Sequence, residues 1–260
     1  MVGDELTLSK IGIITFHSAY NYGSVLQAFA TQTFIKKLGS ENEIINYRLD
    51  EQRRVYSNLR FNYGYKEFIK DLSLLPIYGR RNIRKEKFET FLFENIDASD
   101  ICRTPEDVRK IWDKYPTIIS GSDQIWNKHS LELEHIDWNF MDPYLLKGYH
   151  GKKISYASSI ANMNDWEIKR ILPEINDFAL LSMREETSAK KVSNYLKRNV
   201  ISVLDPTFLL TKEEWIQTLH LNRDNKKFIL FYSLHGITKF NKIKNTLIEL
   251  SKARNCKILT

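Results

Sequence analysis

One stretch, residues 10–39, constrains the fold more than any other part of this 260-residue chain. It opens with the apolar run Ile11–Ile14, which is too short for a helix and has no polar side chain. Such a run is typical of a strand buried in the middle of a parallel sheet. A polar loop follows, and then a helical pattern groups apolar side chains from Val25 to Leu38 on one side and ends at Gly39.

The same alternation of short apolar runs and helical patterns continues along the chain. It predicts an α/β fold with a Rossmann-like parallel sheet flanked by helices. The predicted strands are residues 11–16, 44–47, 117–119, 153–157, 178–183, 200–204, 228–232 and 256–259. The predicted helices are residues 24–38, 66–75, 80–93, 105–115, 165–175, 187–196, 212–219 and 239–254, and residues 51–62 are interpreted as a linker or cover.

The pattern also predicts two domains. Residues 222–227 are polar and look like a linker, and one strand–helix–strand unit follows them. A unit of that size cannot bury a core of its own. We therefore expect residues 10–221 to form one Rossmann-like domain and residues 222–260 to be the start of a second, incomplete one.

Polar residues gather where the predicted strands end, which is where open α/β sheets bind ligands. The first such loop carries His17, Asn21 and Ser24, and Gly23 allows close backbone approach. The helix behind it offers free N–H groups to an anion. The alternative is a turn and a helix cap without a ligand. The loop lacks the pattern GxGxxG, so a dinucleotide site is not supported.

A second polar loop follows the strand at 117–119, and a third follows the strand at 178–183. The second brings together Ser122, Asp123 and Asn127, with a capped turn as the alternative. The third begins with Arg184. These strand ends form a candidate ligand edge.

Four strand-end motifs, in this order and spacing, resemble the polysaccharide pyruvyl transferase family. The motifs are Phe16–Gln27, Gly121–Asn127, Ile154–Ser159 and Met183–Thr187, with Asp205–Thr207 behind the last. The resemblance implies two Rossmann-type halves with a cleft between them, as in glycosyltransferases of the GT-B type. It also implies transfer of a pyruvyl group from phosphoenolpyruvate to sugar hydroxyls of a surface polysaccharide or its precursor, which forms a ketal.

The chain also departs from that family. Members carry a histidine–glycine segment with catalytic groups in the second domain, and His235–Gly236 comes too early to match it. We expect the general acid to lie beyond Thr260.

The resemblance assigns roles to the strand-end residues. An arginine can bind the carboxylate or the phosphate of phosphoenolpyruvate through two parallel N–H donors. Arg184 is the predicted anchor, with an ion pair to Glu185 or Glu186 as the structural alternative. Asp123 is the predicted base, or the group that orients the sugar. The other predicted substrate-binding residues are His17, Asn21, Gly23, Ser122 and Asn127.

The net charge of +7 permits binding to nucleic acid, to an anionic membrane surface or to phosphorylated substrates. Part of the excess lies in residues 80–87, which we interpret as a solvated helix face. No repeating aromatic pattern suited to base stacking accompanies it, so nucleic acid is not an expected partner. The expected partners are phosphoenolpyruvate and a saccharide acceptor, which a lipid carrier can hold near a membrane.

The two cysteines, Cys102 and Cys256, have no CxxC neighbour, so neither a disulfide framework nor a cysteine zinc site is expected. Two unpaired cysteines fit a reducing cytoplasm. No apolar run is long enough to predict a transmembrane segment. We expect no metal and no cofactor besides the donor substrate. Two other functions remain open: a nucleotide-sugar glycosyltransferase of similar fold, and a non-catalytic glycan-binding module.

Overall fold

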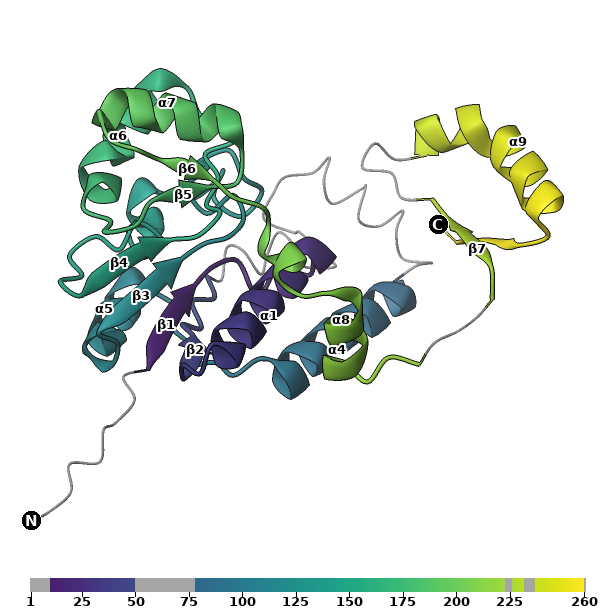
Figure 1. The fold of residues 1–260 in the computed structure, drawn as a ribbon, viewed down its shortest axis with the longest axis horizontal. Helices are drawn as coiled ribbons and strands as arrows, with labels where there is room; N and C mark the ends of the chain where they lie inside the picture. Colours follow the sequence, from purple (N-terminus) through teal and green to yellow (C-terminus); the bar gives the residue numbers. More distant parts are fainter. Residues whose placement is uncertain (1–9, 50–77, 223–225, 232–236, 260) are drawn as a thin grey trace, which may run out of the picture. The chain divides into compact units, whose positions relative to one another are not determined.

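The computed structural model describes residues 10–49, 78–222, 226–231 and 237–259 (Figure 1). The chain divides into two compact units, Met1–Thr211 and Lys212–Thr260, and each is described by itself. The predicted linker or covering segment at 51–62 and the predicted helix at 66–75 lie outside the described residues. The predicted domain boundary at 221/222 stays a prediction.

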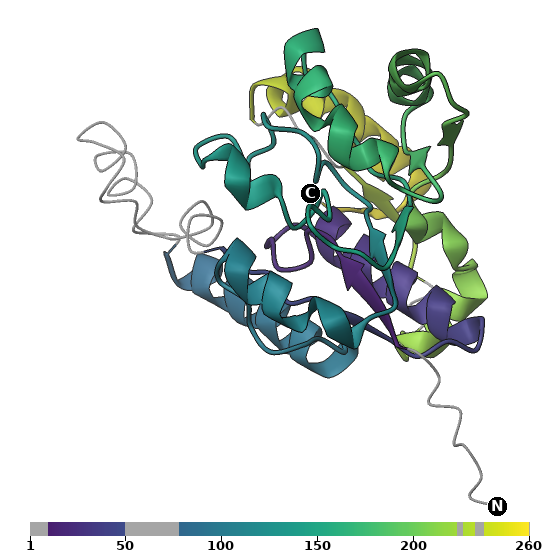
Figure 2. The same cartoon turned by 90° about the vertical axis from the view of Figure 1, so that its left-hand side faces the viewer.

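The first unit is built on four parallel strands in the order β2-β1-β3-β4. The strands are β1 (Ile11–Ile14), β2 (Asn42–Ile44), β3 (Thr117–Ser120) and β4 (Lys152–Ser155). In the centre of the sheet, Ile13 lies opposite Ile44 on one side and Ile119 on the other. Figure 2 shows β1, in purple, in the interior of the unit. The predicted α/β fold with a parallel sheet is confirmed.

Two short strands, β5 (Ser182–Met183) and β6 (Ile201–Ser202), continue the sheet beyond β4. The amide of Ser155 donates to the carbonyl of Leu180 at 2.8 Å, and β5 then pairs with β6 in parallel. Of the predicted strand at 178–183, only Ser182–Met183 forms a regular strand. The residues before it still run beside β4.

Helices connect the strands of this unit. They are α1 (Tyr22–Lys37), α4 (Tyr78–Asn95), α5 (Pro105–Ile111), α6 (Asp165–Asn176) and α7 (Glu186–Leu196), with 3-10 turns η3 (Trp112–Lys114), η4 (Trp138–Met141) and η5 (Pro206–Leu209). Thr104 and Asp107 form the expected capping box at the start of α5. The predicted helix at 105–115 tightens into η3 after Ile111.

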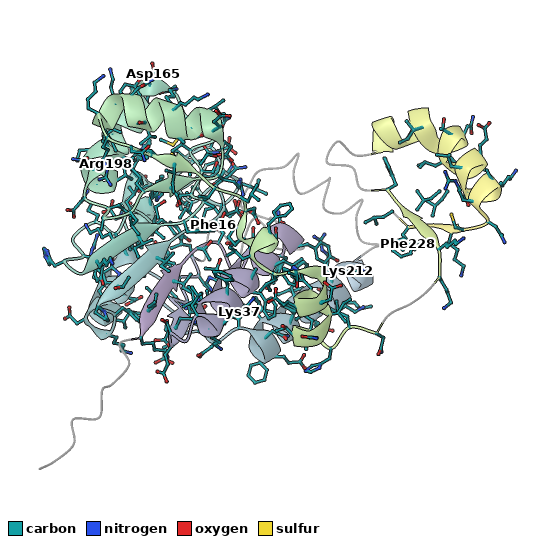
Figure 3. The ribbon with its side chains drawn as sticks, in the orientation of Figure 1. Phe16, Lys37, Asp165, Arg198, Lys212 and Phe228 are labelled. Atoms are coloured by element: carbon teal, nitrogen blue, oxygen red, sulfur yellow. The ribbon has the colours of Figure 1, made fainter. Side chains whose placement is uncertain are left out.

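Apolar side chains pack on both faces of the sheet. Ile13 and Ile44 pack with Ala28 of α1 on one face. Ile14 and Ile118 belong to a larger core on the other face. That core also contains Phe16, which is labelled in Figure 3, Val108 of α5, Ile171 of α6 and Val192 of α7. Because both faces are covered, β1 is apolar throughout, as the sequence predicts.

The second predicted strand is misplaced by two residues, because β2 begins at Asn42 rather than Ile44. Asn42 lies opposite Ile11 in the ladder. Beyond Ile44 the chain leaves β1, and Tyr47 makes an isolated bridge with Cys102. The sequence pattern failed here because Asn42 is polar yet buried, with its amide donating to the carbonyl of Gln32 at 3.3 Å.

The second unit contains α8 (Lys212–Thr218), β7 (Phe228–Leu230), α9 (Ile237–Arg254) and β8 (Lys257–Leu259). β7 and β8 pair in parallel, so they form the expected strand–helix–strand unit with α9. The last residue of the predicted strand at 228–232 lies outside the described residues, and so do His235 and Gly236.

The Gly12→Ala substitution tests the packing of β1. A Cβ at this position would lie 2.9 Å from Tyr115 Cγ and 3.1 Å from Ile45 Cδ1, so the ring and the strand would have to separate. We expect the free energy of unfolding, measured by urea denaturation, to fall by about 1–3 kcal/mol. Gly79→Ala in α4 is the matched control, because among the described residues no atom outside its own helical turn lies within 4 Å of its added Cβ. Equal destabilisation by both substitutions would contradict this packing.

Candidate functional site

The strand order creates a switch point between β1 and β3. The chain passes from β1 to β2 on one side of β1, and later returns to β3 on the other side. Helix α1 packs on one face of the sheet, and the core on the opposite face contains the chain that follows β3. Doubly wound sheets bind ligands at such a point, outside the carboxyl ends of the strands.

The side-chain amide of Gln27, on α1, joins the two loops at this point. Its Nε2 donates to Thr15 Oγ1 at 2.9 Å, and its Oε1 accepts from the amide of Ser122 at 3.2 Å. Thr15 Oγ1 in turn donates to the carbonyl of Ser122 at 2.8 Å. All three residues are buried, so these hydrogen bonds satisfy groups that would be costly to leave unpaired. Gln27 was missed as a site residue, although it is a polar residue on a mainly apolar helix.

The loop after β3 has a sharply turned backbone. Gly121 has φ +124°, and a Cβ there would meet the carbonyl oxygen of Tyr156 at 2.1 Å, so only glycine fits. Asp123 follows with φ 78°, in the left-handed region that few residues other than glycine adopt. Such conformations concentrate at functional sites.

Asp123 lies at the centre of a polar cluster that spans the switch point. Its Oδ2 accepts a hydrogen bond from Ser24 Oγ at 2.7 Å, and Ser24 belongs to the first turn of α1. Its Oδ1 lies 3.7 Å from Arg184 Nη1, which follows β5. The structure thus brings together two of the predicted site residues, Asp123 and Arg184, with a hydroxyl from a third element.

Arg184 also contacts two other carboxylates. Its Nε donates to Glu185 Oε1 at 3.1 Å, and its Nη1 to Asp205 Oδ2 at 3.4 Å. Burial disfavours the charged guanidinium, but Asp123, Glu185 and Asp205 outweigh this and raise the pKa of Arg184 above its ordinary value. We call Ser24, Asp123, Arg184, Glu185 and Asp205 the Arg184 cluster. Its four charged side chains are 20% to 35% exposed, so a ligand can reach them.

The Arg184 cluster has three carboxyl groups and one guanidinium, so it is net negative when they are ionised. Of the two ion pairs considered for Arg184, the structure contains the one with Glu185, whereas Glu186 pairs with Lys190. Among the described residues, Arg184 Nη2 makes no hydrogen bond. Arg184 therefore keeps one donor group for a ligand while its other nitrogens bind carboxylates.

Sequence reasoning did not place Glu185, Asp205 or Tyr156 in the site. Each lies one to three residues after the end of a strand. That position in the sequence could have identified them as candidates. Burial and the charge of Asp205 raise the pKa of Tyr156.

Four of the other predicted residues have partners within the protein. Asn21 caps α1 by accepting from the amide of Gly23 at 2.8 Å, and both residues are exposed. Ser122 is buried, and its hydroxyl donates to the carbonyl of Ala157 at 2.9 Å. Asn127 is also buried, and its amide donates to Gln124 Oε1 at 2.8 Å. Their role in substrate binding stays a prediction.

His17 is buried behind the loop that follows β1. Its Nε2 lies 2.9 Å from Asn46 Oδ1, and its Nδ1 lies 3.2 Å from the carbonyl of Thr15. Burial, together with the positive charge of Arg48, lowers the pKa of His17 to about 4. The ring is therefore neutral near pH 7 and contacts protein groups through both nitrogens. This arrangement favours a structural role over the predicted contact with phosphate.

Two further features concern metals and membranes. In the part of the chain that the structure describes, no group of three or more histidine, cysteine, aspartate or glutamate side chains could hold a metal ion. No helix within the described ranges is long and apolar enough to cross a membrane.

The fold and the Arg184 cluster define an α/β protein with a candidate ligand site at the switch point of a parallel sheet. The family model for polysaccharide pyruvyl transferases matches residues 21–255, which include every residue of this cluster. The chain belongs to the polysaccharide pyruvyl transferase family. No individual curated protein matches the chain.

The low pKa of His17 makes the stability of the protein depend on pH. The unfolded chain takes up a proton near pH 6.5, whereas the folded chain resists it until about pH 4. The contribution of His17 is thus fully present above pH 6.5 and is lost as the pH falls, by about 3 kcal/mol in total. Urea denaturation of the wild type and of His17→Gln should show a stability difference that shrinks across this window. A difference that stays constant would contradict the neutral, buried ring.

Proposed function

We propose that the protein transfers a pyruvyl group from phosphoenolpyruvate to two hydroxyls of a polysaccharide or its precursor, forming a ketal. The observation that carries the proposal is the meeting of Asp123 and Arg184, 3.7 Å apart at the switch point, in a chain of this family. The family supports a transferase that acts on a saccharide. The donor, the ketal and the roles of individual residues are our proposal.

The reaction requires a base and a cation-stabilising site. The terminal carbon of the donor takes up a proton, so positive charge develops at the carbon that bears the phosphate. One sugar hydroxyl bonds to that carbon, and a second then displaces inorganic phosphate. The two hydroxyl protons balance the new methyl C–H bond and the proton on the released phosphate.

Asp123 suits the role of the base in this scheme. Its carboxylate is partly exposed, and Ser24 Oγ holds it at 2.7 Å. A carboxylate in hydrogen-bond reach of a sugar hydroxyl can accept its proton as the new C–O bond forms. The net negative charge of the Arg184 cluster would also stabilise the cationic carbon. We assign the proton delivered to the terminal carbon to a group outside the cluster.

Arg184 suits the carboxylate of the donor better than its phosphate. Nη2 can donate to a ligand, but the surrounding carboxylates oppose a group with more than one negative charge. A bidentate contact would require the guanidinium to give up one of its present partners. We therefore propose that Arg184 binds the carboxylate and that other cations bind the phosphate.

The rest of the architecture follows the same proposal. We propose that β7, α9 and β8 belong to the second Rossmann-like half of a GT-B type fold. A cytoplasmic location fits the two free cysteines, Cys102 and Cys256. A lipid-linked acceptor remains compatible with this scheme.

Calorimetric titration of phosphoenolpyruvate tests the role of Arg184. Arg184→Lys keeps the positive charge but removes the second nitrogen of the fork, so we expect the affinity to fall by about tenfold or more. Arg109→Lys is the matched control, because Arg109 on α5 also pairs with two carboxylates, those of Glu106 and Asp142. Binding of UDP-glucose without any binding of phosphoenolpyruvate would move the assignment to glycosyl transfer.

Asp123→Asn separates catalysis from donor binding. The amide can still accept from Ser24 but is a poor base, so we expect release of inorganic phosphate from phosphoenolpyruvate, with a panel of oligosaccharides as acceptors, to slow by about 10²–10⁴-fold. Donor affinity should stay equal or rise, because one negative charge is gone. Turnover like that of the wild type would exclude Asp123 as the base.

A further inference from the structure

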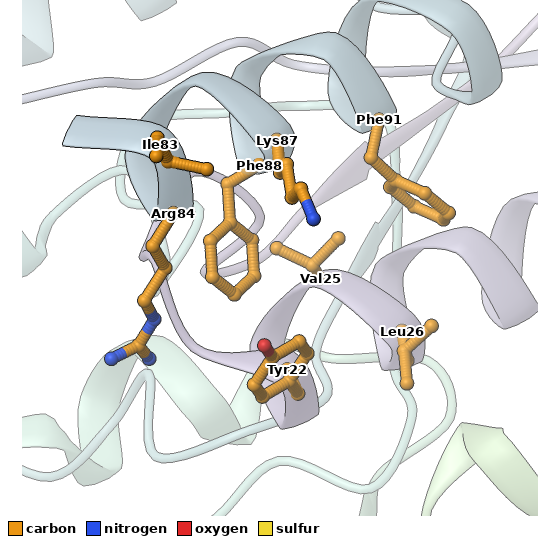
Figure 4. Close-up of a pocket in the computed structure, with 8 residues that line it drawn as sticks. All are labelled: Tyr22, Val25, Leu26, Ile83, Arg84, Lys87, Phe88 and Phe91. Carbon is orange, nitrogen blue, oxygen red and sulfur yellow. The ribbon is translucent and has the colours of Figure 1, made fainter. Parts of the chain in front are cut away.

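A cavity lies between α1 and α4, away from the switch point (Figure 4). It has a volume of about 520 Å³, which is within the range of small-ligand pockets. Tyr22 and Leu26 line it from α1, and Ile83 and Phe91 line it from α4. We call this cavity the α1–α4 groove.

The α1–α4 groove does not belong to the Arg184 cluster. Tyr22 and Leu26 are four residues apart and therefore share one side of α1. Ser24, midway between them, points to a different side of the helix and donates to Asp123. The first turns of α1 thus face two separate sites.

Two cations stand beside the apolar wall of the groove. Lys87 is exposed and has no polar partner among the described residues, and in Figure 4 it points toward Val25. The guanidinium of Arg84 lies 5.7 Å from the ring centre of Tyr22, and it donates to the carbonyl of Tyr20 at 2.9 Å. Neither cation has a carboxylate partner in the described part of the chain. Their charge is therefore available to an anion that also carries an apolar body.

The helix around these residues is strongly basic. Residues 80–88 contain five arginines or lysines and one glutamate. Large apolar side chains are exposed beside them, with Tyr22 at 62% and Ile83 at 54%. Exposed apolar side chains with adjacent lysines and arginines are the chemistry of helices that lie on anionic membranes.

We propose that the α1–α4 groove docks the protein onto an anionic membrane surface. An apolar lipid chain enters between the two helices, and Arg84 and Lys87 contact lipid phosphate. The charge complementarity selects anionic lipid over a neutral surface. This inference does not depend on pyruvyl transfer, because membrane docking requires no substrate.

Flotation of the purified protein with lipid vesicles tests the docking. We expect binding to vesicles of phosphatidylcholine mixed with phosphatidylglycerol, little binding to phosphatidylcholine alone, and weaker binding as salt is raised. Lys87→Ala should weaken binding by about fivefold, the effect of one cation near the surface. Ile83→Ser should weaken it by about fivefold or more through the loss of apolar contact.

Lys152→Ala is the matched control, because Lys152 is an exposed lysine on β4 with no polar partner in the described residues. Thermal unfolding should be unchanged for all three variants, since each replaced side chain is exposed. Equal weakening by Lys152→Ala would show a general charge effect and overturn the proposal, as would full binding by Ile83→Ser.

Two further outcomes would also overturn the proposal. Saturable binding of a soluble short-chain prenyl phosphate, without vesicle binding, would assign the groove to a single amphiphilic molecule. A dimer that Ile83→Ser dissociates, again without vesicle binding, would assign it to a second copy of the chain.

Discussion

The buried amide of Gln27 is the interaction on which the candidate site depends. Where β1 and β3 end, the sheet no longer pairs the backbone groups, and these strand ends are buried. Gln27 supplies a donor to the loop after β1 and an acceptor to the loop after β3, and Thr15 closes the connection to Ser122. An unpaired buried group of this kind costs about 1–3 kcal/mol. The same helix presents Ser24 to Asp123, so the helix that joins the loops also contributes to the position of the cluster.

The charge balance of the Arg184 cluster explains why its residues suit one stage of the proposed reaction better than another. Three carboxylates around one guanidinium favour a carbon that becomes cationic, and they oppose a phosphate group. In the proposed reaction, Asp123 would act on the acceptor and Arg184 on the carboxylate of the donor. The proposal assigns the phosphate to cations outside the cluster.

The sequence was sufficient for the order of the main helices and strands that the structure describes, and for the position of Asp123 and Arg184 at strand ends. Hydrophobic periodicity identified β1 and β3, and the residues Thr104 and Asp107 identified the start of α5. The sequence could not show that His17 is buried, because its ring contacts Asn46, which is 29 residues away along the chain. Nor could it place β2, since a buried polar Asn42 looks like loop. A local sequence pattern predicts which way a side chain faces. It does not predict which distant residue will be the hydrogen-bond partner of a buried polar side chain.

The first turn of α1 has one further consequence. Tyr22 and Ser24 belong to the same helical turn, whose hydrogen-bonded backbone moves as a stiff body. A shift of the backbone at Tyr22 would therefore also shift the Ser24 hydroxyl, which donates to Asp123 Oδ2 at 2.7 Å. A hydrogen bond tolerates only a few tenths of an ångström before it weakens. The position of the Asp123 carboxylate is thus mechanically linked to the α1–α4 groove on the opposite side of the helix.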